Sequence, residues 1–67
     1  MYKMKVNGEI INLENPMNLK DFVESQGYTN GRIAVELNGQ IIPKAAYAQT
    51  VLSDADLMEI VHFVGGG

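Results

Sequence analysis

The chain has 67 residues and a mass of 7.4 kDa, less than half of a typical domain length, so it has room for one domain only. Apolar residues make up 46% and charged residues 19%, a balance that is typical of a globular chain and argues against disorder. Five basic residues against eight acidic ones give a net charge of −3, and the basic residues are scattered, which disfavours nucleic acid as a partner.

The first element is a predicted β-hairpin. Residues 2–6 alternate strictly, with Tyr2, Met4 and Val6 on one face, as in a half-buried strand. Asn7-Gly8 follows, and this pair is a strong hairpin signal because both central residues of a type I′ turn need positive φ. Residues 9–13 are therefore predicted to be the returning strand.

A short helix is predicted over residues 19–26. Asn18 is a good N-cap, and Gly27 can adopt the left-handed conformation that closes a helix. Met17 and Phe22 are placed to form a hydrophobic staple across the helix start. The apolar positions recur on one helical face and are Leu19, Phe22 and Val23.

A second hairpin follows the helix. Residues 32–37 alternate, with Ile33, Val35 and Leu37 facing inward, and Asn38-Gly39 supplies another tight turn. The returning strand covers residues 40–42 only, because Pro43 cannot donate to a strand ladder.

The last third of the chain contains a helical turn and a final strand. Residues 44–49 are expected to form the helical turn, anchored by Tyr47, and residues 53–56 form a polar turn. Residues 57–63 are almost continuously apolar, which is typical of a central strand covered on both faces.

This order of elements predicts an α+β fold, a β-grasp (ubiquitin-like) roll. Its mixed sheet has one main helix packed across one face, and the first and last strands pair in parallel. Residues 1–64 are expected to form the single β-grasp domain, with residues 65–67 as a flexible C-terminal tail.

The sequence offers few groups for catalysis. The absence of Cys excludes disulfides, thiolate metal sites and a cysteine nucleophile. His62 is the only histidine, has no second metal ligand at a recognisable spacing and is assigned no role. Ser25 and Ser53 do not lie in the sequence context of a nucleophile. The chain is therefore predicted not to be an enzyme and to bind neither a metal nor a cofactor of its own.

Targeting signals are also lacking. No apolar run approaches the roughly 20 residues of a membrane span, and residues 1–5 do not resemble a signal peptide. We therefore expect a cytoplasmic protein that does not contact membranes.

Three glycines, residues 65–67, end the sequence and suggest a use for the tail. Because glycine lacks Cβ, such a tail fits a channel too narrow for side chains. Residues 64–67 reach about 13 Å when extended, enough to carry the carboxylate of Gly67 into the active site of a partner. A frayed chain end is the competing interpretation.

Several segments together resemble the ThiS family, the sulfur carrier proteins of thiamin biosynthesis. Ala55 departs from the family pattern, which usually has Gly at this point of the turn and so tolerates positive φ there. The segments that carry the resemblance are Asn38-Gly39-Gln40-Ile41-Ile42-Pro43-Lys44, Tyr47, Ser53-Asp54-Ala55-Asp56, Glu59-Ile60-Val61 and Phe63-Val64-Gly65-Gly66-Gly67.

The resemblance implies that a ThiF-type adenylyltransferase activates the Gly67 carboxylate with ATP. Sulfur from a persulfide donor then displaces AMP and leaves a thiocarboxylate, which thiazole synthase uses to build the thiazole ring. ATP and Mg²⁺ belong to the activating enzyme. Val64, Gly65 and Gly66 are expected to thread into the active site of the partner.

Partner recognition is expected on the sheet face opposite the helix. Leu57, Glu59, Val61 and Phe63 alternate onto that face beside the tail and form a candidate docking patch. In the competing interpretation, residues 44–49 cover Val61 and Phe63.

Two other functions remain open from the sequence. One is a sulfur carrier like the small subunit of molybdopterin synthase. The other is a non-reactive β-grasp interaction module in which the glycines are only a linker. By itself the chain is expected to be a monomer.

Overall fold

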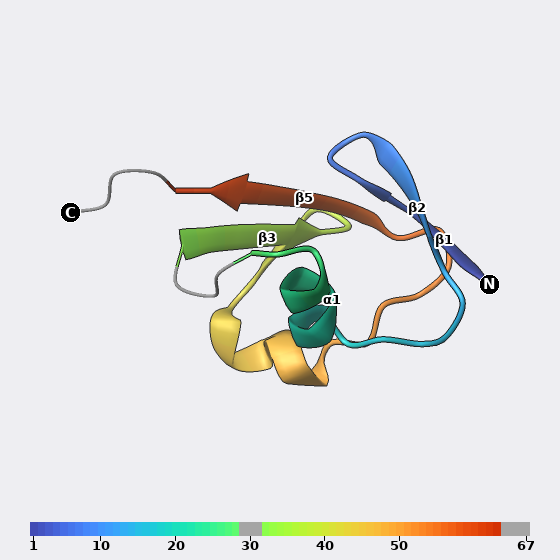
Figure 1. Cartoon of the computed structure of the whole chain (residues 1–67). Helices are drawn as coiled ribbons and strands as arrows, with labels where there is room; N and C mark the ends of the chain where they lie inside the picture. The colour runs from blue at the N-terminus through green and yellow to red at the C-terminus, as the bar shows by residue number, and fades with distance from the viewer. Residues whose placement is uncertain (29–31, 64–67) are drawn as a thin grey trace.

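The computed structural model describes residues 1–28 and 32–63 (Figure 1). Their elements in chain order are β1 (Tyr2–Val6), β2 (Glu9–Leu13), α1 (Leu19–Ser25), β3 (Ile33–Leu37), β4 (Gln40–Ile42), the 3-10 helix η2 (Lys44–Gln49) and β5 (Leu57–His62). These bounds agree with the predicted elements to within one residue at each end.

The strands form one mixed sheet in the order β2-β1-β5-β3-β4. The pairs β1–β2, β3–β4 and β3–β5 are antiparallel, and β1 pairs with β5 in parallel. Figure 1 shows α1 and η2 together on one side of this sheet. The predicted α+β arrangement, with the first and last strands side by side, is confirmed. We call the helix side of the sheet the inner face and the other side the outer face.

Both hairpins turn at an Asn-Gly pair. Asn7 and Gly8 have φ of 50° and 84°, and Asn38 and Gly39 have φ of 52° and 86°. Two consecutive positive φ values are the signature of a type I′ turn. Each turn therefore has the two-residue length that determines the register of its hairpin.

Helix α1 has a defined cap at each end. At its start, the backbone N–H of Asp21 donates to Oδ1 of Asn18 at 2.8 Å, as the sequence predicts. At its end, Tyr28 N–H donates to the carbonyl of Val23 at 3.1 Å and Gly27 N–H to the carbonyl of Glu24 at 3.0 Å. This is the Schellman pattern, and Gly27 adopts it with φ of 86°.

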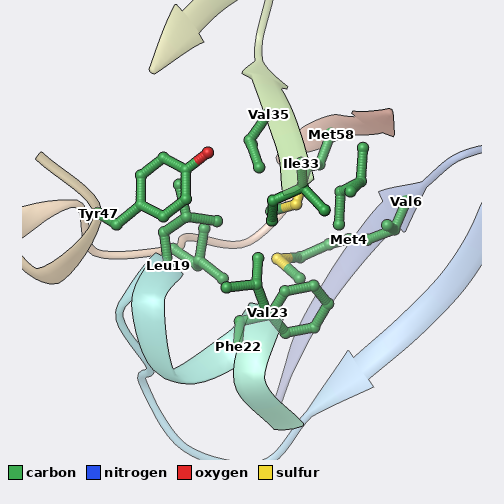
Figure 2. Close-up of a cluster of buried hydrophobic side chains, with 11 residues drawn as sticks. Met4, Val6, Leu19, Phe22, Val23, Ile33, Val35, Tyr47 and Met58 are labelled. Atoms are coloured by element: carbon green, nitrogen blue, oxygen red, sulfur yellow. The ribbon is translucent and has the colours of Figure 1, made fainter. Parts of the chain in front are cut away.

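The hydrophobic core lies between the inner face and the helices, where its side chains point toward one another (Figure 2). Phe22 and Val23 from α1 are fully buried, and so is Val35 from β3. Tyr47 anchors η2 as predicted and is 4% exposed. The whole cluster consists of Met4, Val6, Leu19, Phe22, Val23, Ile33, Val35, Tyr47, Leu52, Met58 and Ile60.

The expectation that the last strand is covered on both faces is wrong. β5 is central, because β1 and β3 flank it, but only Met58 and Ile60 are buried. Leu57 and Val61 face the other way and are exposed. One main helix covers only one face of the sheet. Burial in the core therefore explains Met58 and Ile60, but it does not explain why Leu57 and Val61 on the outer face are apolar.

The turn before β5 ties this strand to β1. Lys3 N–H donates to Oδ1 of Asp54 at 2.8 Å, and Ala55 N–H donates to the Lys3 carbonyl at 2.8 Å. Ala55 adopts φ of 70° to make this contact. The turn therefore forms with alanine at this position, and an L-residue occupies the left-handed region.

Replacing Ala55 by Gly should stabilise the fold by about 0.5–1 kcal/mol, because relief of the left-handed strain exceeds the entropy that glycine loses on folding. Urea denaturation measures the change. Ala48→Gly on η2 is the matched control and should destabilise. A loss of stability in both variants would contradict the assignment of strain to Ala55.

Tyr47 should make the stability depend on pH above about 10. Burial raises the pKa of its phenol, and a hydrogen bond with the Val35 backbone opposes that shift. The neutral phenol therefore stabilises the fold fully below the unfolded-state pKa, and this contribution is lost as pH rises through the folded-state pKa. Between these two values the free energy of unfolding falls by about 1.4 kcal/mol per pH unit for one proton.

Tyr47→Phe tests this pH dependence. The variant is expected to be less stable near neutral pH, since it loses a hydrogen bond worth about 1 kcal/mol. The difference between the two proteins in urea titrations should narrow as pH increases above about 10. Parallel curves for the two proteins would show that the phenol does not titrate differently on folding.

Candidate functional site

The site is organised by β5, and Asn7 holds this strand from the β1 side. Asn7 N–H donates to the Met58 carbonyl at 2.9 Å. Its side chain then accepts from Ile60 N–H at 2.7 Å and donates through Nδ2 to the Ile60 carbonyl at 3.2 Å. One turn residue thus extends the parallel ladder beyond the end of β1.

Asn38 holds the start of β5 from the β3 side in the same manner. Its backbone N–H donates to the Leu57 carbonyl at 2.7 Å, and its Oδ1 accepts from Leu57 N–H at 2.9 Å. Its Nδ2 donates to Oδ1 of the buried Asp56 at 3.0 Å. The other carboxylate oxygen of Asp56 accepts from Ser53 N–H at 2.7 Å. Both Asn-Gly turns therefore position β5 as well as reversing the chain.

The outer face presents the side chains that the sequence assigned to docking. Leu57 is 58% exposed, Val61 55% and Phe63 53%, and Glu59 between them is also exposed. The alternation along β5 places Leu57, Glu59 and Val61 on this face, and Phe63 follows in the same alternation. The structure thus brings the four residues together in one row.

The strand register adds two residues that the sequence analysis missed. Ile10 pairs with Lys5, which pairs with Leu57, and Ile41 pairs with Glu36, which pairs with Glu59. Ile10 and Ile41 therefore share the outer face, and they are 53% and 67% exposed. The lengths of the two Asn-Gly turns are the signal that predicts these registers within each hairpin.

The interpretation in which residues 44–49 cover Val61 and Phe63 is wrong. η2 contacts α1, and its Tyr47 belongs to the core cluster of the inner face. Figure 1 shows this segment beside the helix, on the opposite side of the sheet from the outer face. The apolar residues of the outer face are accordingly open to solvent.

The end of β5 leads to the predicted tail. Phe63 N–H donates to the Arg32 carbonyl at 2.7 Å and extends the contact between β5 and the residues before β3. His62 alternates toward the inner face, with its ring edge-on to Tyr28 at a centroid distance of 6.1 Å. The tail residues of the prediction, Val64, Gly65, Gly66 and Gly67, lie outside the described residues.

Within residues 1–28 and 32–63, no group of three or more His, Cys, Asp or Glu side chains is arranged to hold a metal ion. In the same part of the chain, the helices are too short or too polar to cross a membrane.

Comparison with known proteins identifies relatives over nearly the whole chain. The sequence model of the ThiS family matches residues 4–67. The sulfur carrier protein ThiS of Bacillus subtilis is 45% identical over 49 residues, which cover 73% of this chain and 74% of that protein. A thiazole synthase of Paramagnetospirillum magneticum is 40% identical over 65 residues, 97% of this chain. The chain spans only 20% of the length of that synthase.

A solved structure has the same fold. The crystal structure of a thiamine biosynthesis protein (ThiS) from Geobacter metallireducens superimposes with a TM-score of 0.82 at 26% sequence identity. The match covers 97% of this chain and 99% of that one. The β-grasp fold predicted from the sequence is therefore confirmed.

Asn7→Gly tests how far the side chain of Asn7 holds β5. Glycine accepts the positive φ, so the variant removes only the two side-chain hydrogen bonds to Ile60. We expect a loss of about 1–3 kcal/mol in urea denaturation, because the part-buried Ile60 backbone is left without partners. Asn15→Gly, in the exposed loop after β2, is the control and should change stability much less. Equal effects would show that the Asn7 side chain is dispensable.

Proposed function

The chain belongs to the ThiS family of sulfur carrier proteins, and on this premise we propose that its Gly67 carboxylate is the group that carries sulfur. A ThiF-type adenylyltransferase activates this carboxylate with ATP as an acyl-adenylate, releasing pyrophosphate. The terminal sulfur of a persulfide donor displaces AMP and forms an acyl disulfide with Gly67. A thiol of the donor or of a reductant then cleaves the S–S bond, which releases the Gly67 thiocarboxylate and leaves a disulfide on the thiol partner. Thiazole synthase then takes the sulfur for the thiazole ring and returns the carboxylate.

The observation that carries this proposal is the extent of the family match, which runs through residue 67 and so includes the glycine tail. Membership of a sulfur carrier family also agrees with the prediction that the chain is not itself an enzyme. ATP and Mg²⁺ are used by the activating enzyme. In this proposal residues 1–64 form the folded carrier and residues 65–67 its reactive tail, and the protein acts in the cytoplasm.

The position of Phe63 supports the delivery of the tail. Its backbone hydrogen bond to Arg32 is the last contact of the described chain with the sheet. Four residues follow, and fully extended they reach about 13 Å. Val64, Gly65 and Gly66 would then thread a narrow channel of the partner, because glycine adapts its φ and ψ to the channel and occupies little width.

The outer face supports docking beside this tail. Leu57, Glu59 and Val61 of β5 are exposed, and so is Phe63, which follows the last residue of the strand. Exposed large apolar side chains that gather on one face of a small domain commonly mark a protein interface. We propose these four residues as the docking surface for the enzymes that load and unload Gly67.

The relatives named thiazole synthase support that enzyme as a partner. Their chains contain a segment similar to this protein, within a polypeptide about five times as long. Two binding partners held in one chain meet at a high effective concentration. The family match likewise favours this role over a molybdopterin-synthase subunit or a non-reactive module.

Intact-mass analysis tests the proposal. After incubation with ATP, an active ThiF-type enzyme, a persulfide donor and a thiol reductant, the protein should gain the mass of one O-to-S exchange. Deletion of Gly67 should abolish this gain while leaving the fold and enzyme binding intact, since the docking surface is unchanged. An unchanged mass of the wild-type protein with a demonstrably active enzyme would exclude the carrier function.

A second variant pair separates docking from chemistry in the same assay. Val61→Asp places a charge on the outer face and should slow the mass gain by at least about tenfold, because desolvating an unpaired charge is costly. Val51→Asp is the matched control, since Val51 is 62% exposed but lies on the loop that bridges to Asn18. Equal rates for these two variants would show that docking uses another surface.

A further inference from the structure

Two carboxylates face each other at the centre of the outer face. Glu36 of β3 and Glu59 of β5 are direct cross-strand partners, so their side chains leave the sheet side by side. Like charges in this position destabilise a sheet. Among the described residues, Lys20–Glu24 on α1 is an ion pair at 3.1 Å, and neither Glu36 nor Glu59 has a cationic partner within 4 Å. The two carboxylates are thus adjacent without an ion pair to either of them in the described part of the chain.

Apolar side chains surround this pair. Ile41 lies beside Glu36 in the register, and Leu57 and Val61 flank Glu59 along β5. All three are more than half exposed. Covering this face by another protein would therefore remove the carboxylates from water, and the pair would then require a cation to offset its desolvation.

A groove next to the pair offers space for such a cation. It has a volume of about 430 Å³, and the two carboxylates share it with one cation, Lys5, which pairs with Leu57 in the sheet. The rest of the lining is Gly8, Asn38, Gly39, Leu57 and Met58. At Gly8 and Gly39 the position of a Cβ meets no atom within 4 Å, so the space beside these two turns is open. A long side chain can lie over Leu57 and reach both carboxylates from there.

We infer that the outer face recognises a partner surface that places an arginine between Glu36 and Glu59, with apolar residues around it. A planar guanidinium has five donors and can bond two carboxylates at once, and its stem can pack on apolar neighbours. This inference rests on the proposed function, because it concerns the same docking surface and the same enzymes.

A second copy of this chain is a poor occupant of the face. In a symmetric dimer the same patch meets itself, so the carboxylate pairs of two chains would approach each other. Each chain also has a net charge of −3. The Glu36–Glu59 pair therefore opposes self-association through the outer face and favours a basic partner. Repulsion between like charges thus contributes to the choice of partner.

The double variant Glu36→Gln/Glu59→Gln tests the inference with the ThiF-type adenylyltransferase of the same genome as the probe. We expect its affinity for the enzyme to fall by at least about tenfold. The dependence of affinity on salt between about 50 and 300 mM should weaken, because screening no longer acts on the pair. The unfolding midpoint should stay the same or increase, because a like-charge contact is removed.

Two controls accompany this variant. Glu14→Gln/Glu24→Gln makes the same change in net charge away from the outer face and should leave affinity within about twofold. Lys5→Gln removes the cation that lines the same groove beside Leu57 and should leave affinity unchanged or increase it, because Lys5 competes with an incoming cation. If Lys5→Gln lowers the affinity for the enzyme as much as Glu36→Gln/Glu59→Gln does, the groove binds an anion and the inference is overturned.

The remaining outcomes separate this inference from the proposed function. If wild type forms the thiocarboxylate but the glutamate variant binds as wild type does, the inference fails and the carrier function stands. If the affinity depends on the pair but no thiocarboxylate forms, the docking inference stands without the carrier function. Two further results would overturn the inference. The first is a wild-type dimer, seen by sedimentation, that Val61→Asp dissociates. The second is a lower unfolding midpoint for the Glu36→Gln/Glu59→Gln variant than for wild type.

Discussion

The placement of β5 between β1 and β3 is the constraint on which the rest of this structure depends. Parallel pairing with β1 brings the first and last strands together across all the intervening residues, which is an entropically demanding closure. Asn7 and Asn38 secure it from opposite sides with side-chain bonds to the backbone of β5. The core and the outer face both follow from this one strand.

The two faces of β5 have different tasks. Its inner side chains, Met58 and Ile60, complete the core with α1, and the fold needs them because a chain of this size buries little apolar surface. Its outer side chains contribute little to the core and are free to serve recognition. Substitutions on the outer face can therefore alter binding while the fold persists.

Such a division suits a carrier, whose chemistry is supplied by other enzymes. In the proposed function the folded part has to present a tail and a recognisable surface, and the sequence continues from β5 directly into the three terminal glycines. The like-charged pair Glu36–Glu59 illustrates how stability and specificity diverge on the outer face. The contact between the two carboxylates is unfavourable in the isolated protein. In the proposed complex it favours binding of a partner that supplies a positive charge.

The sequence by itself determined the local elements, because short-range physics specifies them. Asn-Gly requires the type I′ turns, Asn18 and Gly27 cap the helix, and strict alternation marks the strands and their inner side chains. The order of these elements also predicted the fold class, and the resemblance of several segments to the ThiS family predicted the family. Leu57, Glu59, Val61 and Phe63 were placed correctly on the outer face for the same reason, since alternation is local.

Only the tertiary structure decided what lies around those four residues. The apolar run of the last strand is equally typical of a strand buried on both faces and of one with an exposed interface, so the sequence could not tell whether a second layer covers it. The pairing of Glu36 with Glu59 and the position of Ile41 beside them depend on the long-range register of β3 against β5. That register arises when the whole core packs against α1, and no local pattern encodes it.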